Sequence, residues 1–163
     1  MKVVFLDIDG VVNTLMIYKN NNDKLNLKQG NDGYFYDICS HYDLRVSNTQ
    51  AVVWLDKICH DFNLSIVISS TWRYDYEDTC KSLYNSGLSE DIKILGATKI
   101  MHKARGIEIQ DFLDSHPFID DFIILDDDSD MEHLINHLIK VNTYTGLNYN
   151  HYLAISDYFK GDD

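Results

Sequence analysis

The sequence predicts an α/β fold in which a five-stranded parallel sheet lies between two layers of helices. Three observations support this prediction. Apolar runs of strand length alternate along the chain with stretches of helical periodicity, which is the order expected of β-α-β units. The apolar runs are continuous, as is typical of strands that are buried on both faces. Polar clusters follow three of the runs, at the positions where strands of such a sheet end.

The first strand is expected at Val3–Leu6, a run of β-branched and aromatic residues that is followed by acids and Gly10. Residues 14–46 then interrupt the pattern. They contain three consecutive asparagines, two glycines and the aromatic group Tyr34–Tyr36, which either forms a small core of its own or lines the entrance to a site. We therefore expect a small flap at about 14–46 and no large cap over the sheet.

Helices and strands alternate from residue 50 to the C-terminus. Helices are predicted where apolar residues recur at helical spacing, and strands where short continuous apolar runs occur. The predicted helices cover residues 50–62, 75–86, 106–115, 130–138 and 150–159. The predicted strands after the first are Leu64–Ile68, Ile92–Leu95, Phe122–Leu125 and Ile139–Val141.

Length and composition are those of one compact domain. The chain has 163 residues, of which 45% are hydrophobic and 25% are charged. A domain of this length buries about 68–70% of its unfolded surface and needs no disulfide or structural metal to fold. The cysteines, Cys39, Cys59 and Cys80, are odd in number and widely spaced, which favours reduced thiols over disulfides or a zinc site. We expect a single domain over residues 1–163.

The charge is strongly negative and unevenly distributed. Fourteen Lys and Arg against 26 Asp and Glu give a formal net charge of −12. Residues 106–163 carry 2 basic and 13 acidic side chains, whereas residues 1–105 carry 12 and 13. Extended binding to nucleic acid normally needs a basic face that displaces counterions, so we expect no extended nucleic-acid surface. A local basic pocket is compatible with this charge.

No segment predicts targeting to a membrane. Asp7 and Asp9 interrupt the N-terminal apolar run before it reaches the length of a signal peptide. No stretch approaches the roughly 18 apolar residues of a membrane-spanning helix. We therefore expect a cytoplasmic protein that does not bind membranes.

Polar clusters follow the first, second and fourth predicted strands. They are Asp7-Ile8-Asp9-Gly10-Val11, Ser69-Ser70-Thr71-Trp72-Arg73 and Asp126-Asp127-Asp128-Ser129-Asp130. In an open α/β sheet, ligands bind beyond the carboxyl ends of the strands, where the strand order reverses. The three clusters meet at that place if the first strand lies between the other two.

The residue types in these clusters indicate a cation site and phosphoryl chemistry. Carboxylates cannot lie together in ionised form without a cation, because like charges repel strongly at close range. Oxygen ligands without nearby His or Cys favour Mg²⁺. A metal and a carboxylate that face a hydroxyl cluster suit phosphoryl transfer. A plainer role is open for Asp130, which is a good N-cap for the predicted helix that follows it.

The motifs resemble those of the haloacid-dehalogenase-like (HAD-like) phosphohydrolases along almost the whole chain. Asp7-Ile8-Asp9 is similar to the first motif of that family, Ser69 to its second-motif Ser/Thr, and the acids at 126–130 to its fourth motif. A closer resemblance is to the phosphatase domains associated with Swiss Army Knife RNA repair proteins. It rests on the stretches 68–73, 105–109 and 125–130. The resemblance implies a Rossmann-like core with strand order 3-2-1-4-5.

The resemblance also implies catalytic roles. Asp7 would attack phosphorus and form an aspartyl-phosphate, while Asp9 would act first as general acid and then as general base. Ser69 would hydrogen-bond the transferring phosphoryl group. Lys103 and Arg105 both qualify as the cation of the third motif. We favour Arg105, because it opens the Arg-Gly-Ile-Glu-Ile stretch and a guanidinium grips phosphate oxygens bidentately.

Ligand sets for metal and substrate follow from the same resemblance. The expected Mg²⁺ ligands are Asp7, Asp9, Asp126, Asp127 and Asp130. Asp127 is the first choice in the fourth motif and Asp126 the alternative, whereas Asp130 would hold a metal-bound water and Asp9 would contribute its backbone carbonyl. The substrate-binding candidates are Ser70, Arg73, Trp72 and Gly10. Arg73 would bind a phosphate, and Trp72 would either stack on a base or simply pack in the core.

These observations predict a Mg²⁺-dependent phosphatase that hydrolyses a phosphomonoester. Its partner would be a phosphorylated polynucleotide end or a small molecule such as a nucleoside monophosphate. Two alternatives are not enzymes. A phosphoacceptor module would need an Asp after the third strand, which ends near Gly96 without one. A catalytically silent Mg²⁺-binding module would be signalled by loss of Asp7 or Asp9, and both are present.

Overall fold

A five-stranded sheet forms the centre of the computed structural model, which describes residues 1–14, 27–29, 35–37 and 49–161. The sheet order is β5-β4-β1-β6-β7, and every neighbouring pair of strands is parallel. The strands are β1 (Lys2–Leu6), β4 (Leu64–Ile68), β5 (Ile94–Ala97), β6 (Asp121–Asp126) and β7 (Leu138–Lys140). This arrangement confirms the predicted α/β class and the order 3-2-1-4-5.

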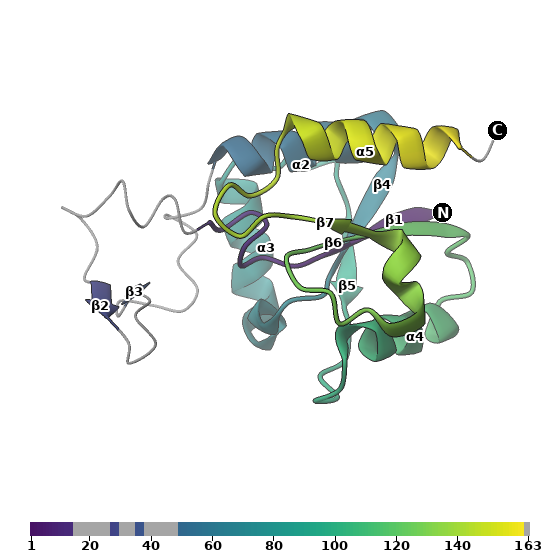
Figure 1. Cartoon of the computed structure of the whole chain (residues 1–163), viewed down its shortest axis with the longest axis horizontal. Coiled ribbons are helices and arrows are strands. Elements are labelled where there is room, and N and C mark those ends of the chain that lie inside the picture. The colour runs from purple at the N-terminus through teal and green to yellow at the C-terminus, as the bar shows by residue number, and fades with distance from the viewer. Residues whose placement is uncertain (15–26, 30–34, 38–48, 162–163) are drawn as a thin grey trace.

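Helices cover both faces of the sheet. The elements on one face are α2 (Thr49–Phe62), α3 (Tyr76–Asn85) and α5 (Tyr149–Lys160), and those on the other are α4 (Arg105–Ser115) and the 3-10 helix η3 (Glu132–His137). Figure 1 shows α2 and α5 side by side above the sheet and α4 below it. Alternate β1 side chains enter two apolar clusters, Val4 and Leu6 on the first face, Val3 and Phe5 on the second. Burial on both faces explains why this strand is apolar throughout.

The segment between β4 and α3 begins as a 3-10 turn. The predicted helix 75–86 is α3, and it is preceded by η2 (Thr71–Asp75), which follows β4 almost directly. The Ser70 hydroxyl caps η2 by accepting a hydrogen bond from the backbone N–H of Trp72 at 3.4 Å. This turn places Trp72 and Arg73 immediately beyond the carboxyl end of β4.

Two predicted elements differ from the structure. The predicted helix 130–138 is only η3, because Glu132 has a φ of +52°, outside the right-handed helical region. The predicted strand Ile92–Leu95 lies two residues later, as β5. Its pairing with β4 shifts between Ile66 and Val67, so Val67 pairs with Gly96. Met131 and Leu134 are buried, as their apolar spacing predicts, whereas Ile135 and Leu95 are exposed.

Only part of the expected flap belongs to the described residues. Within 14–46, these are Thr14 and the antiparallel pair of β2 (Leu27–Gln29) and β3 (Phe35–Asp37). Tyr34 and Cys39 lie outside them, whereas Cys59 and Cys80 are free thiols, as predicted. Among the helices that the structure describes, none has the length and apolar character needed to cross a membrane.

Candidate active site

The carboxyl ends of three neighbouring strands bring the polar clusters together. β1 lies between β4 and β6, so the turns after all three strands open at one edge of the sheet. Backbone hydrogen bonds hold the ends of these strands side by side. The N–H of Asp7 donates to the carbonyl of Leu125 at 2.9 Å, and the N–H of Ser69 donates to the carbonyl of Leu6 at 2.8 Å. The convergence expected from the sequence is therefore present.

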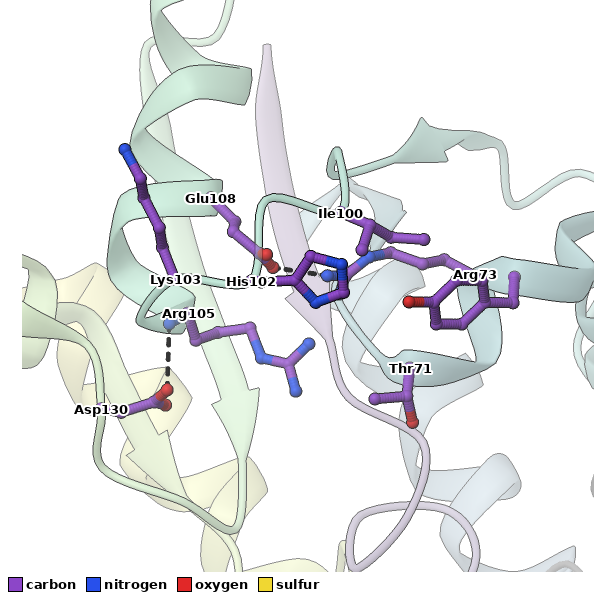
Figure 2. Close-up of a pocket in the computed structure, with 9 residues that line it drawn as sticks. Thr71, Arg73, Ile100, His102, Lys103, Arg105, Glu108 and Asp130 are labelled. Atoms are coloured by element: carbon purple, nitrogen blue, oxygen red, sulfur yellow. Dashed lines mark hydrogen bonds and ion pairs between the residues drawn. The ribbon is translucent and has the colours of Figure 1, made fainter.

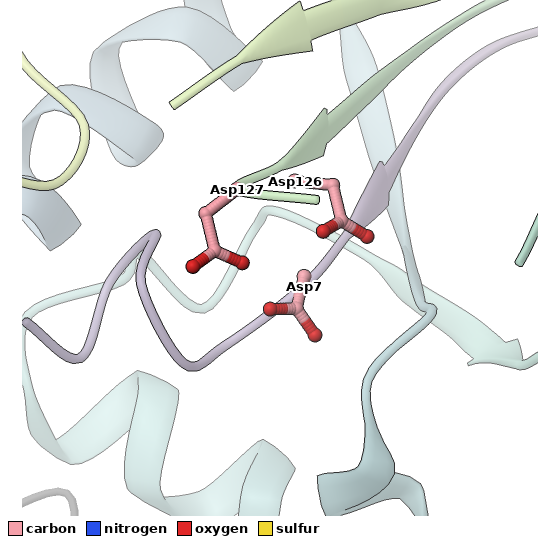
Figure 3. Close-up of side chains that lie close together, drawn as sticks. All are labelled: Asp7, Asp126 and Asp127. Carbon is pink, nitrogen blue, oxygen red and sulfur yellow. The ribbon is translucent and has the colours of Figure 1, made fainter. Parts of the chain in front are cut away.

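Three carboxylates form the centre of the site. Asp7, Asp126 and Asp127 each place an oxygen within 4.8 Å of the others, and Figure 3 shows them facing one another. Asp7 is 6% exposed and Asp126 is 1% exposed. The Thr143 hydroxyl, from the loop after β7, donates to Asp127 Oδ2 at 2.5 Å. Buried acids at this spacing form a site that needs positive charge.

The ionisation of this cluster is strongly perturbed. Burial raises the pKa of Asp7 well above its ordinary value, and the neighbouring Asp126 raises it further, while Arg105 and a hydrogen bond from the Ser70 hydroxyl oppose the rise. Burial also raises the pKa of Asp126 to about 6, against the lowering by the Asp128 backbone N–H and by Arg105. Both carboxyls resist ionisation unless a cation compensates them.

The cluster fits a hard divalent cation. Its donors are all carboxylate oxygens, which Mg²⁺ prefers to the nitrogen and sulfur ligands of zinc or copper. Asp126 Oδ2 is buried and has no hydrogen-bond partner within the described ranges, although Arg105 Nε lies 3.6 Å away. Both expected acids of the fourth motif, Asp126 and Asp127, belong to the cluster.

Arg105 supplies positive charge to the same cluster. Its Nη2 lies 3.7 Å from Asp7 Oδ1, and its Nη1 donates to the backbone carbonyl of Ser69. One guanidinium thus connects the ends of β1, β4 and β6. The alternative cation, Lys103, is exposed, and in Figure 2 its side chain extends away from the Arg105 guanidinium. Of the two candidates, the structure brings Arg105 to the carboxylates.

Asp130 fixes the position of α4. Its carboxylate accepts a hydrogen bond from the backbone N–H of Arg105 at 3.0 Å (Figure 2), and its carbonyl accepts one from Gly106 at 3.1 Å. The expectation that Asp130 caps the helix following it is wrong, because Met131 is the N-cap of η3. Asp130 instead caps α4, which is distant in sequence. The three-carboxylate cluster does not include it.

Asp9 is not one of the three clustered carboxylates. Its side chain is exposed, and both of its oxygens accept hydrogen bonds from buried donors. Trp72 Nε1 donates to Oδ2 and Asn13 Nδ2 donates to Oδ1, each at 2.8 Å. Gly10 follows with a φ of +80°, and a Cβ there would overlap the Asp127 carboxylate. Gly10 thus permits the close approach of the two acidic turns.

Two adjacent serines have different surroundings. Ser69 is fully buried, and its hydroxyl has no hydrogen-bond partner in the part of the chain that is described. Ser70 is also buried, and its side chain both caps η2 and hydrogen-bonds Asp7. The Ser69 hydroxyl is thus unpaired among the described residues, and the phosphoryl-binding role expected from the second motif stays a prediction.

Arg73 is held in a buried ion pair. Its Nη2 lies 2.5 Å from Glu108 Oε2, and both side chains are at most 6% exposed. Arg73 Nη1 also donates to the Ser70 carbonyl at 3.1 Å, and Glu108 Oε1 accepts from the Met101 backbone at 2.8 Å. The Arg73 guanidinium is therefore already bound to groups of the protein. Its expected role in binding a phosphate stays a prediction.

A pocket of about 190 Å³ adjoins Arg105. Figure 2 shows the residues that line it. They are Thr71, Arg73, Tyr74, Ile100, His102, Lys103, Arg105, Glu108 and Asp130. Because the Arg105 side chain lines the pocket and also lies 3.7 Å from Asp7, the pocket adjoins the carboxylate cluster at Arg105.

Sequence reasoning missed three residues of the site. Thr143 reaches it from the loop after β7, far in sequence from the acidic clusters, so no local signal could have indicated it. Glu108 lies in the 105–109 stretch that supports the family resemblance, although no role was expected for it. Asn13 lies four residues after Asp9 in the same turn, and an amide at that spacing was a signal that could have been used.

A comparison with known protein families gives a match. The sequence model of a protein family described as the HAD domain in Swiss Army Knife RNA repair proteins matches residues 3–152. The matched range includes every residue of the site described above. No curated protein matches the chain.

Proposed function

We propose that this chain, which belongs to the family of HAD domains in Swiss Army Knife RNA repair proteins, is a Mg²⁺-dependent phosphomonoesterase. Membership of this family supports a hydrolase of the HAD phosphatase type. A single observation carries this proposal. The buried Asp7 carboxylate lies between two further carboxylates and the Arg105 guanidinium, 3.7 Å away. Such a site combines a nucleophile with compensating charges for a phosphoryl group.

The first chemical step uses Asp7 and Asp9. An oxygen of Asp7 attacks phosphorus, the bond from phosphorus to the leaving oxygen breaks, and an aspartyl-phosphate forms. The protonated carboxyl of Asp9 gives its proton to the leaving oxygen, so the product departs as an alcohol. Arg105 and the Ser69 hydroxyl bind the phosphoryl oxygens during the transfer.

The second step returns the enzyme to its starting state. The Asp9 carboxylate takes a proton from water as the water oxygen attacks phosphorus. The bond between phosphorus and Asp7 breaks, and inorganic phosphate leaves. Asp7, Asp126 and Asp127 would hold the Mg²⁺, which when bound neutralises negative charge on the phosphoryl oxygens.

We propose a phosphorylated polynucleotide end as the substrate. The pocket beside Arg105 is smaller than the roughly 300–1,000 Å³ of ordinary ligand sites, so it suits one terminal residue rather than a long strand. The net charge of −12 opposes contact with more of the nucleic acid. A nucleoside monophosphate has the same terminal group and is the second candidate, favoured by the same pocket size.

Phosphate release tests the proposal. The panel contains nucleoside monophosphates, sugar phosphates and oligonucleotides with a 3′- or 5′-phosphate, each assayed with Mg²⁺ and with EDTA. We expect phosphate release only with Mg²⁺, and we expect Asp7→Asn to lower the rate of release by at least about 10³-fold. The control Asp157→Asn, which changes an exposed acid of α5, should release phosphate at the wild-type rate. Mg²⁺ binding without release from any substrate would instead support a silent binding module. Stable phosphorylation without turnover would support a phosphoacceptor.

A further inference from the structure

The carboxylate of Asp9 is held at both oxygens although its side chain is exposed. Trp72 Nε1 donates to one oxygen and Asn13 Nδ2 to the other, each at 2.8 Å. An exposed aspartate normally exchanges among several rotamers. Here two donors that are themselves buried, 6% and 5% exposed, select one orientation. Hydrogen bonds to an ionised carboxylate are stronger than those between neutral groups.

Each donor is anchored to a different rigid piece of the fold. The Trp72 ring packs in the apolar cluster between the sheet and α3, and its carbonyl accepts a hydrogen bond from the buried Thr79 hydroxyl at 2.9 Å. Asn13 belongs to the turn after β1, where its backbone N–H donates to Ile8 at 2.9 Å. The orientation of Asp9 therefore depends on how the turn after β1 lies against η2.

We propose that Trp72 is a positioning residue, whose indole N–H directs the Asp9 carboxyl toward the leaving oxygen of the substrate. This inference rests on the proposed function for the role of Asp9. Proton transfer requires the acid to lie within hydrogen-bond distance of the leaving oxygen, so a rotated Asp9 side chain would be ineffective. The Trp72 ring is 6% exposed and offers no open face to a base, which favours this role over the stacking role suggested by the sequence.

Nuclear magnetic resonance tests the contact without any assay of activity. The chain has two tryptophans, so its spectrum contains two indole N–H signals, and Trp54→Phe identifies the one from Trp72. In Asp9→Ala, we expect the Trp72 signal to shift upfield and its proton to exchange faster with water, while the Trp54 signal stays in place. An unchanged Trp72 signal would overturn the proposal.

The dependence on the leaving group tests the positioning role. Trp72→Phe keeps an aromatic ring but removes the N–H. We expect kcat/KM for an alkyl phosphate to fall about tenfold or more, the cost of losing a hydrogen bond to a charged group. For p-nitrophenyl phosphate, whose leaving group needs no proton, the fall should be much smaller. An equal fall for both substrates would indicate general damage to the fold and would overturn the proposal.

A matched control separates the possible failures. Trp54→Phe removes the other indole N–H, from a ring that packs against Tyr149 and Tyr152. It should leave the ratio of the two kcat/KM values at the wild-type level. If wild-type protein released phosphate from neither compound, the proposed function would fail, and the resonance experiment would still decide whether Trp72 holds Asp9. If Trp72→Phe does not fold, Asp9→Ala still tests the contact.

Discussion

At the scale of single residues, the site depends on how closely the turn after β1 approaches the end of β6. Gly10 has a φ of +80°, and the space that a Cβ would fill is occupied by the Asp127 carboxylate. Asp127 in turn accepts a hydrogen bond from Thr143 at 2.5 Å. The position of one carboxylate of the cluster thus depends on the absence of a side chain at Gly10.

We expect Gly10→Ala to disrupt the carboxylate cluster. The new methyl group would displace Asp127 and would also require an alanine with a positive φ. Phosphate release should fall at least about 100-fold, with weaker Mg²⁺ binding by calorimetry. Gly87→Ala is the control, since it has a φ of +114° but nothing within 4 Å of the new Cβ. It should lower stability by about 1–2 kcal/mol without affecting Mg²⁺ binding. Similar Mg²⁺ affinities in both variants would contradict this explanation.

The raised pKa of Asp126 predicts a pH dependence of stability in Mg²⁺-free protein. Burial raises this pKa to about 6 from an ordinary value of 3.8, so the folded protein binds the proton more tightly than the unfolded chain does. The free energy of unfolding therefore falls as pH rises from about 4 to about 6, by on the order of 3 kcal/mol from this group.

Thermal unfolding in EDTA measures this effect. Asp126→Asn cannot ionise, so the difference in Tm between variant and wild type should be small at pH 4 and should grow in favour of the variant up to about pH 6. Addition of Mg²⁺ at pH 7 should raise the Tm of the wild type and leave that of Asp126→Asn nearly unchanged. A constant Tm difference across this pH range would refute the prediction.

At the scale of secondary-structure elements, α4 carries the positive charge into the site. Arg105 is the first residue of the helix, and Asp130 accepts its backbone N–H. Gly106 allows this end of α4 to contact the backbone of Met131, where a side chain would overlap the carbonyl. The loop after β6 therefore sets both the acidic cluster and the place from which Arg105 reaches it.

We expect Arg105→Lys to be far from conservative. The guanidinium contacts Asp7, Asp126 and the Ser69 carbonyl together, which an ammonium cannot do from one position. A fall in kcat/KM of about 10–100-fold should result, against a much smaller fall for Lys103→Ala. The comparison decides between the two cations suggested by the sequence. A larger effect at Lys103 would assign the third motif to that residue.

At the scale of the whole molecule, the negative charge disfavours extended contact with nucleic acid. The acidic excess lies in residues 106–163, which contribute β6, α5 and most of α4. The positive side chains of the pocket are few, and Arg73 is paired with Glu108. Contact with a polynucleotide is therefore expected to be confined to its phosphorylated end.

Substrate length and salt test this expectation. A short and a long oligonucleotide with the same terminal phosphate should have similar KM values. The logarithm of KM should depend weakly on the logarithm of salt concentration, with a slope of about 1 or less, as for one or two phosphate contacts. A KM that fell steadily with length, together with a steep salt dependence, would reveal an extended binding surface.

The order of strands and helices could be predicted from the sequence because apolar periodicity is a local property. Burial on one face or on both is recorded in the spacing of neighbouring residues, as in Val3–Leu6 and in residues 50–62. The three polar clusters could also be placed at one edge, since strands that are parallel end at the same side of the sheet. The candidate nucleophile Asp7 and the two acids after β6 followed from that rule.

Tertiary structure alone decided which of these residues touch. Three contacts show this. Trp72 donates to Asp9, Arg105 and not Lys103 reaches the carboxylates, and Asp130 caps α4. Each contact joins residues that are distant in sequence or depends on the direction in which an element presents its side chains. Tertiary contacts also decided that η3 forms where the sequence predicts a longer helix at 130–138. Such contacts depend on strand register and on the approach of one element to another, and periodicity within a single segment contains no information about either.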